Sequence, residues 1–144
     1  MKKHVRLVSI MLAACILASN TVTVFAAREP KTGISPLWDD VSTITSRMEV
    51  DSWGIASVSA TTWAATTSSA DSVKLIVELQ RYEDNKWNTI KSWEDNQGVT
   101  FAAVNEKYAI KKGYSYRLYL TVKAYKGSKL LETATDIYNY GLYN

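Results

Sequence analysis

The stretch "IKKGYSYRLYLTVKA", residues 110–124, gives the clearest structural signal in the chain, because its second half alternates between two kinds of side chain. One set should point into a core: Tyr116, Leu118, Leu120, Val122 and Ala124. The other set should point outward: Arg117, Tyr119, Thr121, Lys123 and, one residue further on, Tyr125. Successive side chains of a β-strand point to opposite faces of a sheet, so this period of two predicts a half-buried strand.

The same alternation recurs along the chain between clusters of Gly, Asn, Asp and Ser, which are typical of turns. It predicts strands over 43–50, 55–64, 73–82, 87–94, 99–105, 114–125 and 130–138. We find no convincing 3.6-residue apolar period over ten residues, which disfavours helices. Short strands at this spacing predict an all-β fold, a seven-stranded antiparallel β-sandwich.

Two hairpins predict which side chains share a face. In the first, a turn over 83–86 sets Tyr82 opposite Trp87. Counting back then sets Gln80 opposite Thr89, Glu78 opposite Lys91 and Ile76 opposite Trp93. A pairing of opposite charges suggests that this is the outer face of the sheet.

The second hairpin turns over 126–129 and is expected to set Tyr125 opposite Leu130, Lys123 opposite Glu132 and Tyr119 opposite Asp136. This pairing places another opposite-charge pair on the outer face. It assigns four residues of the last strand to the core side: Leu131, Thr133, Thr135 and Ile137.

The segment 110–116 resembles the tyrosine corner of immunoglobulin-like and fibronectin type III sandwiches. The resemblance implies a structural role for two residues. Gly113 would permit a sharp corner, and Tyr116 would turn inward with its hydroxyl bonded to backbone near Ile110. It also implies that the strands of both hairpins share one sheet.

The outer face of that sheet then carries candidate ligand-binding residues: Tyr82, Trp87, Trp93, Arg117, Tyr119, Lys123 and Tyr125. Exposed aromatic side chains beside charged groups can stack on sugar rings or anchor a protein partner. Two alternatives stay open. Cross-strand aromatic pairs stabilise a sheet without any ligand, and Leu37 and Trp38 of the preceding segment could cover the face.

Residues 1–26 have the pattern of a secretory signal peptide, with a basic start, an apolar stretch and small residues before a cut between Ala26 and Ala27. We expect secretion, a linker over 27–40 and one domain over 41–144, with no transmembrane segment in the mature chain. As an alternative, "LAAC" resembles a bacterial lipobox, so that acylated Cys15 would anchor the protein at the cell surface.

Removal of residues 1–26 leaves 118 residues with 14 basic and 14 acidic side chains, which gives no indication of nucleic-acid binding. It also removes the only cysteine and the only histidine, Cys15 and His4. Without them, Ser-His and Cys-His catalysis and Cys/His zinc sites are excluded, and we expect no cofactor and no metal. Glycan hydrolysis would need two carboxylates facing each other across a cleft, and no motif supplies them.

As a whole, the chain resembles a family of short secreted proteins of Gram-positive bacteria whose function is uncharacterised. The similarity lies in "SPLWDDVSTIT" (35–45), "LQRYEDNKWNTIKSW" (79–93) and "KGYSYRLYLTV" (112–122). It implies a free-standing immunoglobulin-like sandwich and brings no catalytic residues. We therefore expect a non-enzymatic interaction module for an extracellular protein or glycan. The alternatives are a carbohydrate-active or cell-wall-active protein and a self-associating surface or matrix protein, that is, a homo-oligomer.

Overall fold

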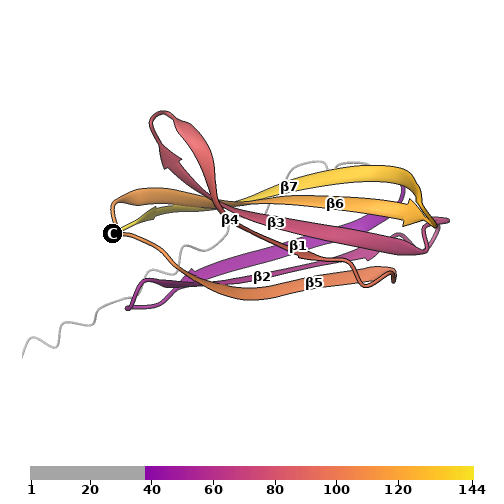
Figure 1. The fold of residues 1–144 in the computed structure, drawn as a ribbon, viewed down its shortest axis with the longest axis horizontal. Coiled ribbons are helices and arrows are strands. Elements are labelled where there is room, and N and C mark those ends of the chain that lie inside the picture. The colour runs from indigo at the N-terminus through magenta and orange to yellow at the C-terminus, as the bar shows by residue number, and fades with distance from the viewer. Residues whose placement is uncertain (1–37) are drawn as a thin grey trace, which may run out of the picture. The chain divides into compact units, whose positions relative to one another are not determined.

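The computed structural model describes residues 38–144, which form two antiparallel sheets and contain no helix (Figure 1). One sheet has the order β1-β2-β5 and the other the order β4-β3-β6-β7. The strands are β1 (Val41–Val50), β2 (Ile55–Ala64), β3 (Ser72–Glu83), β4 (Lys86–Asp95), β5 (Phe101–Ala109), β6 (Tyr114–Lys126) and β7 (Lys129–Tyr143). The prediction of an all-β fold is confirmed. The predicted signal peptide, its Ala26–Ala27 cleavage point and Cys15 lie outside the described residues.

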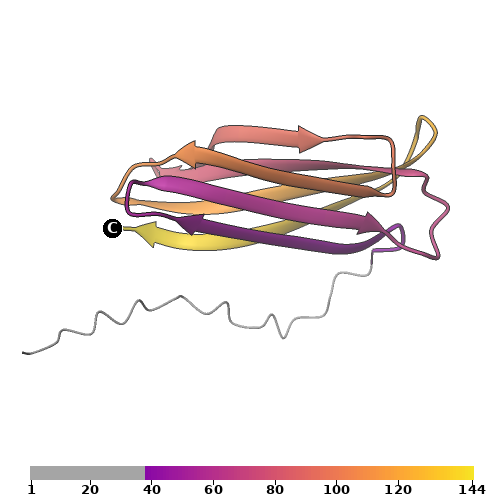
Figure 2. The same ribbon diagram turned by 90° about the horizontal axis from the view of Figure 1, so that it is seen from below.

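The two sheets pack around one hydrophobic core. In Figure 2, seen from below, the strands of the three-stranded sheet lie in front of those of the four-stranded sheet. The inward residues of β6 are all buried, from Tyr116 to Ala124, as the alternation predicted. They meet the inward residues of β3 and, from the other layer, small side chains such as Ala56 and Ala60 of β2. Full burial of a Leu or Val side chain contributes about 1.5–3 kcal/mol, so this shared core is the main stabilising feature.

Both hairpins of the four-stranded sheet contain a β-bulge that the sequence pattern did not reveal. In the first hairpin, Tyr82 pairs with Trp87 and Gln80 with Thr89 as predicted, and the register then shifts between Leu79 and Gln80. An extra residue on one strand turns every later side chain to the opposite face. The predicted pairing of Glu78 with Lys91 is therefore wrong, because Glu78 lies opposite Ser92.

The same bulge moves Trp93, which lies opposite Val77 rather than Ile76. Val77 is completely buried, and cross-strand partners share a face, so Trp93 faces the core side of the sheet. It packs against the core, and its ring meets that of Tyr108 edge-on at 6.3 Å between centroids. The prediction that Trp93 belongs to the outer face is wrong.

The second hairpin begins as predicted, with Tyr125 opposite Leu130, and shifts register immediately afterwards. Ala134 and Tyr138 consequently lie against the core. The predicted core residues Thr133, Thr135 and Ile137 lie instead opposite Lys123, Thr121 and Tyr119 on the outer face. A second register shift lies between Tyr116 and Arg117, and β7 continues past it to Tyr143, five residues beyond the predicted end at residue 138.

Glu132 was predicted to pair with Lys123, but in the structure it has a different role. It lies opposite Ala124, and its carboxylate accepts hydrogen bonds from the backbone N–H groups of Asp39, Asp40 and Val41 at 3.2, 2.8 and 3.1 Å. These bonds fasten the start of β1 to β7. Trp38 packs against the core beside this junction, so it does not cover the outer face. Leu37 lies outside the described residues.

Candidate functional site: the outer face of the four-stranded sheet

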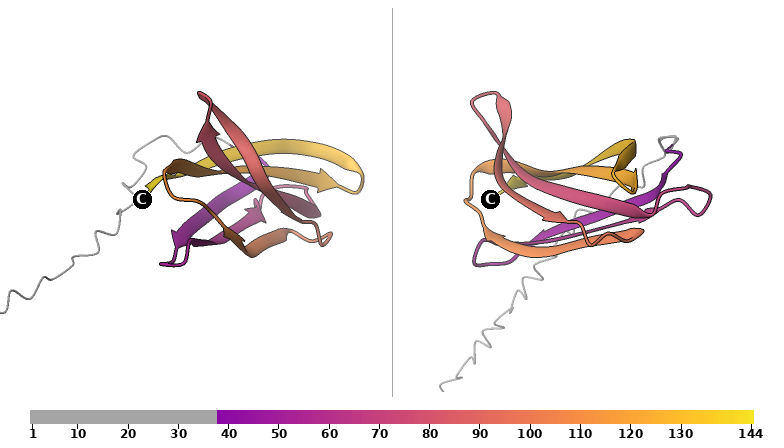
Figure 3. Two further views of the ribbon diagram at one scale, coloured as in Figure 1. Left: turned by 60° about the vertical axis from the view of Figure 1, so that its left-hand side comes forward. Right: turned by 45° about the vertical axis from the view of Figure 1, so that its right-hand side comes forward.

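A connected group of polar and aromatic side chains lies on the outer face where β4, β3 and β6 run side by side. We call it the outer-face cluster and define it as Tyr82, Trp87, Arg117, Gln80 and Thr89. Strand alternation places all of these side chains on the outer face. The first bulge does not alter the pairing of Tyr82 with Trp87, because the register shifts only beyond Gln80. The hairpin end that carries these two aromatics extends away from the other strands in both views of Figure 3.

The turn that joins β3 to β4 fixes the aromatic pair. Asp84 and Asn85 both have positive φ, 55° and 60°, which is the conformation of a tight type I′ hairpin turn. The rings of Tyr82 and Trp87 consequently lie 5.2 Å apart between centroids and are tilted by 58°. Tyr82 is 43% exposed and so presents part of its ring to solvent.

Arg117 is held on two sides. Its guanidinium carbon lies 4.3 Å from the centroid of the Trp87 ring, a cation–π arrangement, and its Nε donates a 2.8 Å hydrogen bond to Oε1 of Gln80. Within residues 38–144 its two terminal nitrogens have no hydrogen bond or ion pair. The guanidinium is therefore positioned by its inner edge and has its outer donors free for another molecule.

A chain of hydrogen bonds supports this arrangement from β3 and β4. The side-chain amide of Gln80 donates to the hydroxyl of Thr89 at 3.2 Å, and that hydroxyl donates to the carboxylate of Glu78 at 3.1 Å. Gln80 is only 9% exposed, so its amide has little freedom to reorient. These hydrogen bonds hold Gln80 in place and so fix the Nε side of the Arg117 guanidinium.

The remaining predicted site residues follow β6 away from the cluster. Tyr119 lies between Glu78 and Ile137, Lys123 lies opposite Lys74, and Tyr125 lies opposite Ser72 near the far turn. All three are half-buried. The structure therefore places six of the seven candidates on one face, with Tyr82, Trp87 and Arg117 in contact and the other three spread along the strand.

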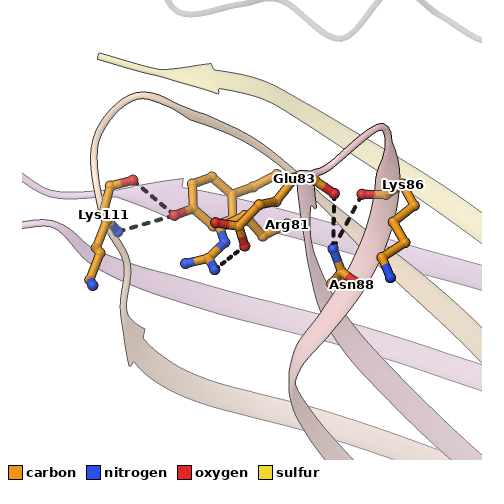
Figure 4. A network of polar contacts seen from close by, with 6 residues as sticks. Arg81, Glu83, Lys86, Asn88 and Lys111 are labelled. Carbon is orange, nitrogen blue, oxygen red and sulfur yellow. Dashed lines mark hydrogen bonds and ion pairs between the residues drawn. The ribbon is translucent and has the colours of Figure 1, made fainter.

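The predicted corner residues lie on the opposite side of the sheet. Tyr116 is buried, and its hydroxyl accepts from the backbone N–H of Lys111 at 3.1 Å and donates to the carbonyl of the same residue at 2.8 Å (Figure 4). The partner is thus one residue beyond Ile110. Gly113, with φ of 86°, has the left-handed backbone that favours glycine.

Sequence reasoning missed Arg81, which lies next to this corner at the edge of a shallow cavity of about 380 Å³. Arg81 forms an ion pair with Glu83 (Figure 4). Its guanidinium carbon lies 4.5 Å from the ring centroid of Tyr114. The hydrogen bond with Glu83 raises the pKa of Arg81, although burial opposes it. Its inward position, next in the alternation after Leu79, could have identified it.

Residues 38–144 contain no cluster of three or more His, Cys, Asp or Glu side chains that could hold a metal ion. No helix in this part of the chain is long and apolar enough to cross a membrane. Comparison of the chain with protein-family models, with curated proteins and with solved structures finds no match. The candidate site therefore has to be interpreted from its own geometry.

Proposed function

We propose that this chain is an exported, non-enzymatic interaction module with a seven-stranded immunoglobulin-like fold, and that it contacts a cell-surface molecule through the outer-face cluster. Two features support the fold assignment. The strand orders β1-β2-β5 and β4-β3-β6-β7 are those of a two-sheet Greek-key sandwich, and Tyr116 bonds back to the backbone five residues upstream, as a tyrosine corner does.

The observation that carries the functional proposal is the position of Arg117. Arg117 combines a fixed position with terminal nitrogens that make no hydrogen bond or ion pair within residues 38–144. One edge of its guanidinium is fixed by Gln80 and one face by Trp87, and the partly exposed ring of Tyr82 lies beside Trp87. Aromatic and arginine side chains held in this way are the residue types that dominate recognition surfaces.

A non-enzymatic role fits the chemistry available after export. The chain without residues 1–26 has neither His nor Cys, so acid–base or nucleophilic work would rest on carboxylates, Tyr, Lys or Ser. On the outer face, the carboxylate of Glu78 is engaged by Thr89 and that of Glu94 by Lys74. These carboxylates hold their neighbours rather than face each other across a cleft, as a hydrolytic pair would.

The proposal is tested by sedimentation of protein made from the full-length sequence with purified Gram-positive cell-wall sacculi that retain their wall polymers. We expect the wild-type protein to sediment with the sacculi and Tyr82→Ala to lose most of this binding. Trp53→Ala is the matched control, because Trp53 is 87% exposed and lies in the turn between β1 and β2 of the other sheet.

The outer face is not the binding surface if Tyr82→Ala and Trp53→Ala sediment equally. The proposal also fails if the wild-type protein does not sediment at all. Circular dichroism and thermal unfolding of each variant exclude loss of folding as the cause, and Tyr82, being partly exposed, is suitable for this truncation.

A further inference from the structure

We infer that the ligand of the outer face is an anionic glycan, whose carboxylate or phosphate group binds the terminal nitrogens of Arg117. This inference rests on the proposed function and specifies the class of ligand. The planar guanidinium offers parallel donors that match the two oxygens of a carboxylate or phosphate, and such bidentate contacts are both directional and strong.

Arg117 is prepared for this contact before any ligand arrives. Its Nε bond to Gln80 and its contact with Trp87 fix the plane and direction of the guanidinium. Fixing a long side chain in advance lowers the ordering cost of binding. Tyr82, beside Trp87, supplies a partly exposed ring against which the apolar side of a sugar ring can pack.

The charges on this face favour an anionic ligand along its length. Of the basic side chains there, Lys74 is neutralised by Glu94 at 2.8 Å, whereas Arg117 and Lys123 have no ion pair among the described residues. They are six residues apart on β6, and both point outward. At about 3.3 Å per strand residue they are separated by about 20 Å, which suits a polymer with repeated anionic groups.

The hydrogen-bonding groups between these cations favour a sugar over a nucleic acid. Tyr119 and Thr121 lie between Arg117 and Lys123 along the strand, and Glu78 lies directly opposite Tyr119. Hydroxyl, phenol and carboxylate groups can bond the hydroxyl groups of a sugar. Two unpaired cations are also too few for the many phosphate contacts that nucleic-acid binding requires.

The test compares three polymers of matched length, by isothermal titration at low and at physiological salt, with protein made from the full-length sequence. Polygalacturonate carries carboxylates, polyglycerol phosphate carries phosphates, and dextran is neutral. We expect at least tenfold tighter binding to one or both anionic polymers than to dextran. The preferred anionic polymer identifies whether carboxylate or phosphate is the natural group.

Variants of Arg117 separate charge from geometry. We expect Arg117→Gln to weaken binding to the anionic polymer about tenfold or more, and Arg117→Lys, which keeps the charge but not the fork, to recover only part of it. Lys111→Gln is the matched control, because Lys111 is exposed and lies in the β5–β6 connection away from the outer face. It should bind as the wild type does.

Equal binding of dextran and the anionic polymers, unaffected by Arg117→Gln but lost in Tyr82→Ala, would overturn the inference while leaving the proposed function intact. Binding of anionic polymers that Lys111→Gln weakens as much as Arg117→Gln does would also overturn it, since attraction would then be non-specific. Sedimentation with sacculi but binding to none of the three polymers would do so as well. Failure of the wild-type protein to bind either polymers or sacculi would overturn both.

Discussion

The hydroxyl of Tyr116 provides the sharpest test of how the fold is held together. Its oxygen makes two hydrogen bonds to one residue, accepting from the N–H of Lys111 at 3.1 Å and donating to its carbonyl at 2.8 Å. Tyr116→Phe removes both bonds and leaves the ring, which is 1% exposed, in place. The substitution therefore isolates the link between β6 and the connection that precedes it.

The expected cost follows from what the hydroxyl leaves behind. A buried backbone group without a partner costs about 1–3 kcal/mol, and two such groups would set an upper limit of about 6 kcal/mol. Lys111 is exposed, so water can satisfy much of its N–H and C=O. We therefore expect a loss of about 2 kcal/mol in the free energy of unfolding. For a domain of about 100 residues this lowers Tm by roughly 10 °C.

Urea unfolding followed by tryptophan fluorescence measures this loss directly, and an unchanged m value would show that the compactness of both states is unaltered. Tyr119→Phe is the matched control on the same strand, because the Tyr119 hydroxyl has no hydrogen-bond partner within residues 38–144. A loss below about 0.5 kcal/mol for Tyr116→Phe, or equal losses for the two variants, would refute the reasoning.

Three further predictions concern other parts of the molecule. Glu132→Ala removes the acceptor of three backbone N–H groups and should lower the free energy of unfolding by about 2 kcal/mol. Glu132→Gln keeps one side-chain oxygen and should lower it by less. Equal losses for the two variants in urea unfolding would contradict this. Trp93→Ala should lower the free energy of unfolding by about 2–3 kcal/mol because Trp93 packs against the core, whereas Trp87→Ala on the outer face should lower it by about 1 kcal/mol or less. A larger loss for Trp87→Ala would contradict the observed register and favour the one predicted from the sequence. Burial, and to a smaller extent the neighbouring Tyr143 and Tyr138, raises the pKa of Tyr140 above its ordinary 10.0. The phenol therefore ionises at lower pH in the unfolded chain than in the folded one, and stability should fall as the pH rises past about 10. Tyr140→Phe should reduce this fall in unfolding measured between pH 8 and 11, and an identical pH profile for both proteins would exclude Tyr140 as its cause.

Much of the fold was predictable because strand alternation and turn residues are local signals. The alternation from Tyr116 to Ala124 correctly identified the core side of β6, and the turn at Asp84 and Asn85 correctly paired Tyr82 with Trp87. These features depend on neighbours in sequence, which a single chain displays directly.

The bulges could not be predicted in the same way, since an extra residue in a strand leaves no distinctive local composition. Trp93 was consequently placed on the wrong face, and Glu132 was assigned to Lys123 instead of to the start of β1. A plausible ion pair supported the wrong register in both hairpins. Hydrophobicity would have been a better guide than charge pairing, because the predicted register of each hairpin left an apolar residue on the outer side of the sheet.

The candidate site was predictable in its residue types but not in its contacts. Periodicity brought Trp87 and Arg117 to one face, but only the structure shows the guanidinium of Arg117 over the Trp87 ring and the Nε bond to Gln80. Gln80 itself was missed, since a lone glutamine in a strand usually reads as a solvated residue. Its low exposure marks it as the support of the cluster.

The most direct test of recognition through the outer face is a ¹H–¹⁵N NMR titration of the protein with the anionic polymer that binds it best in calorimetry. Polymer should shift the Arg117 Nε–H and Trp87 indole N–H signals together and leave the exposed indole N–H of Trp53 unchanged. A titration that moves the Trp53 signal while those of Arg117 and Trp87 stay still would contradict the account and place binding elsewhere on the molecule.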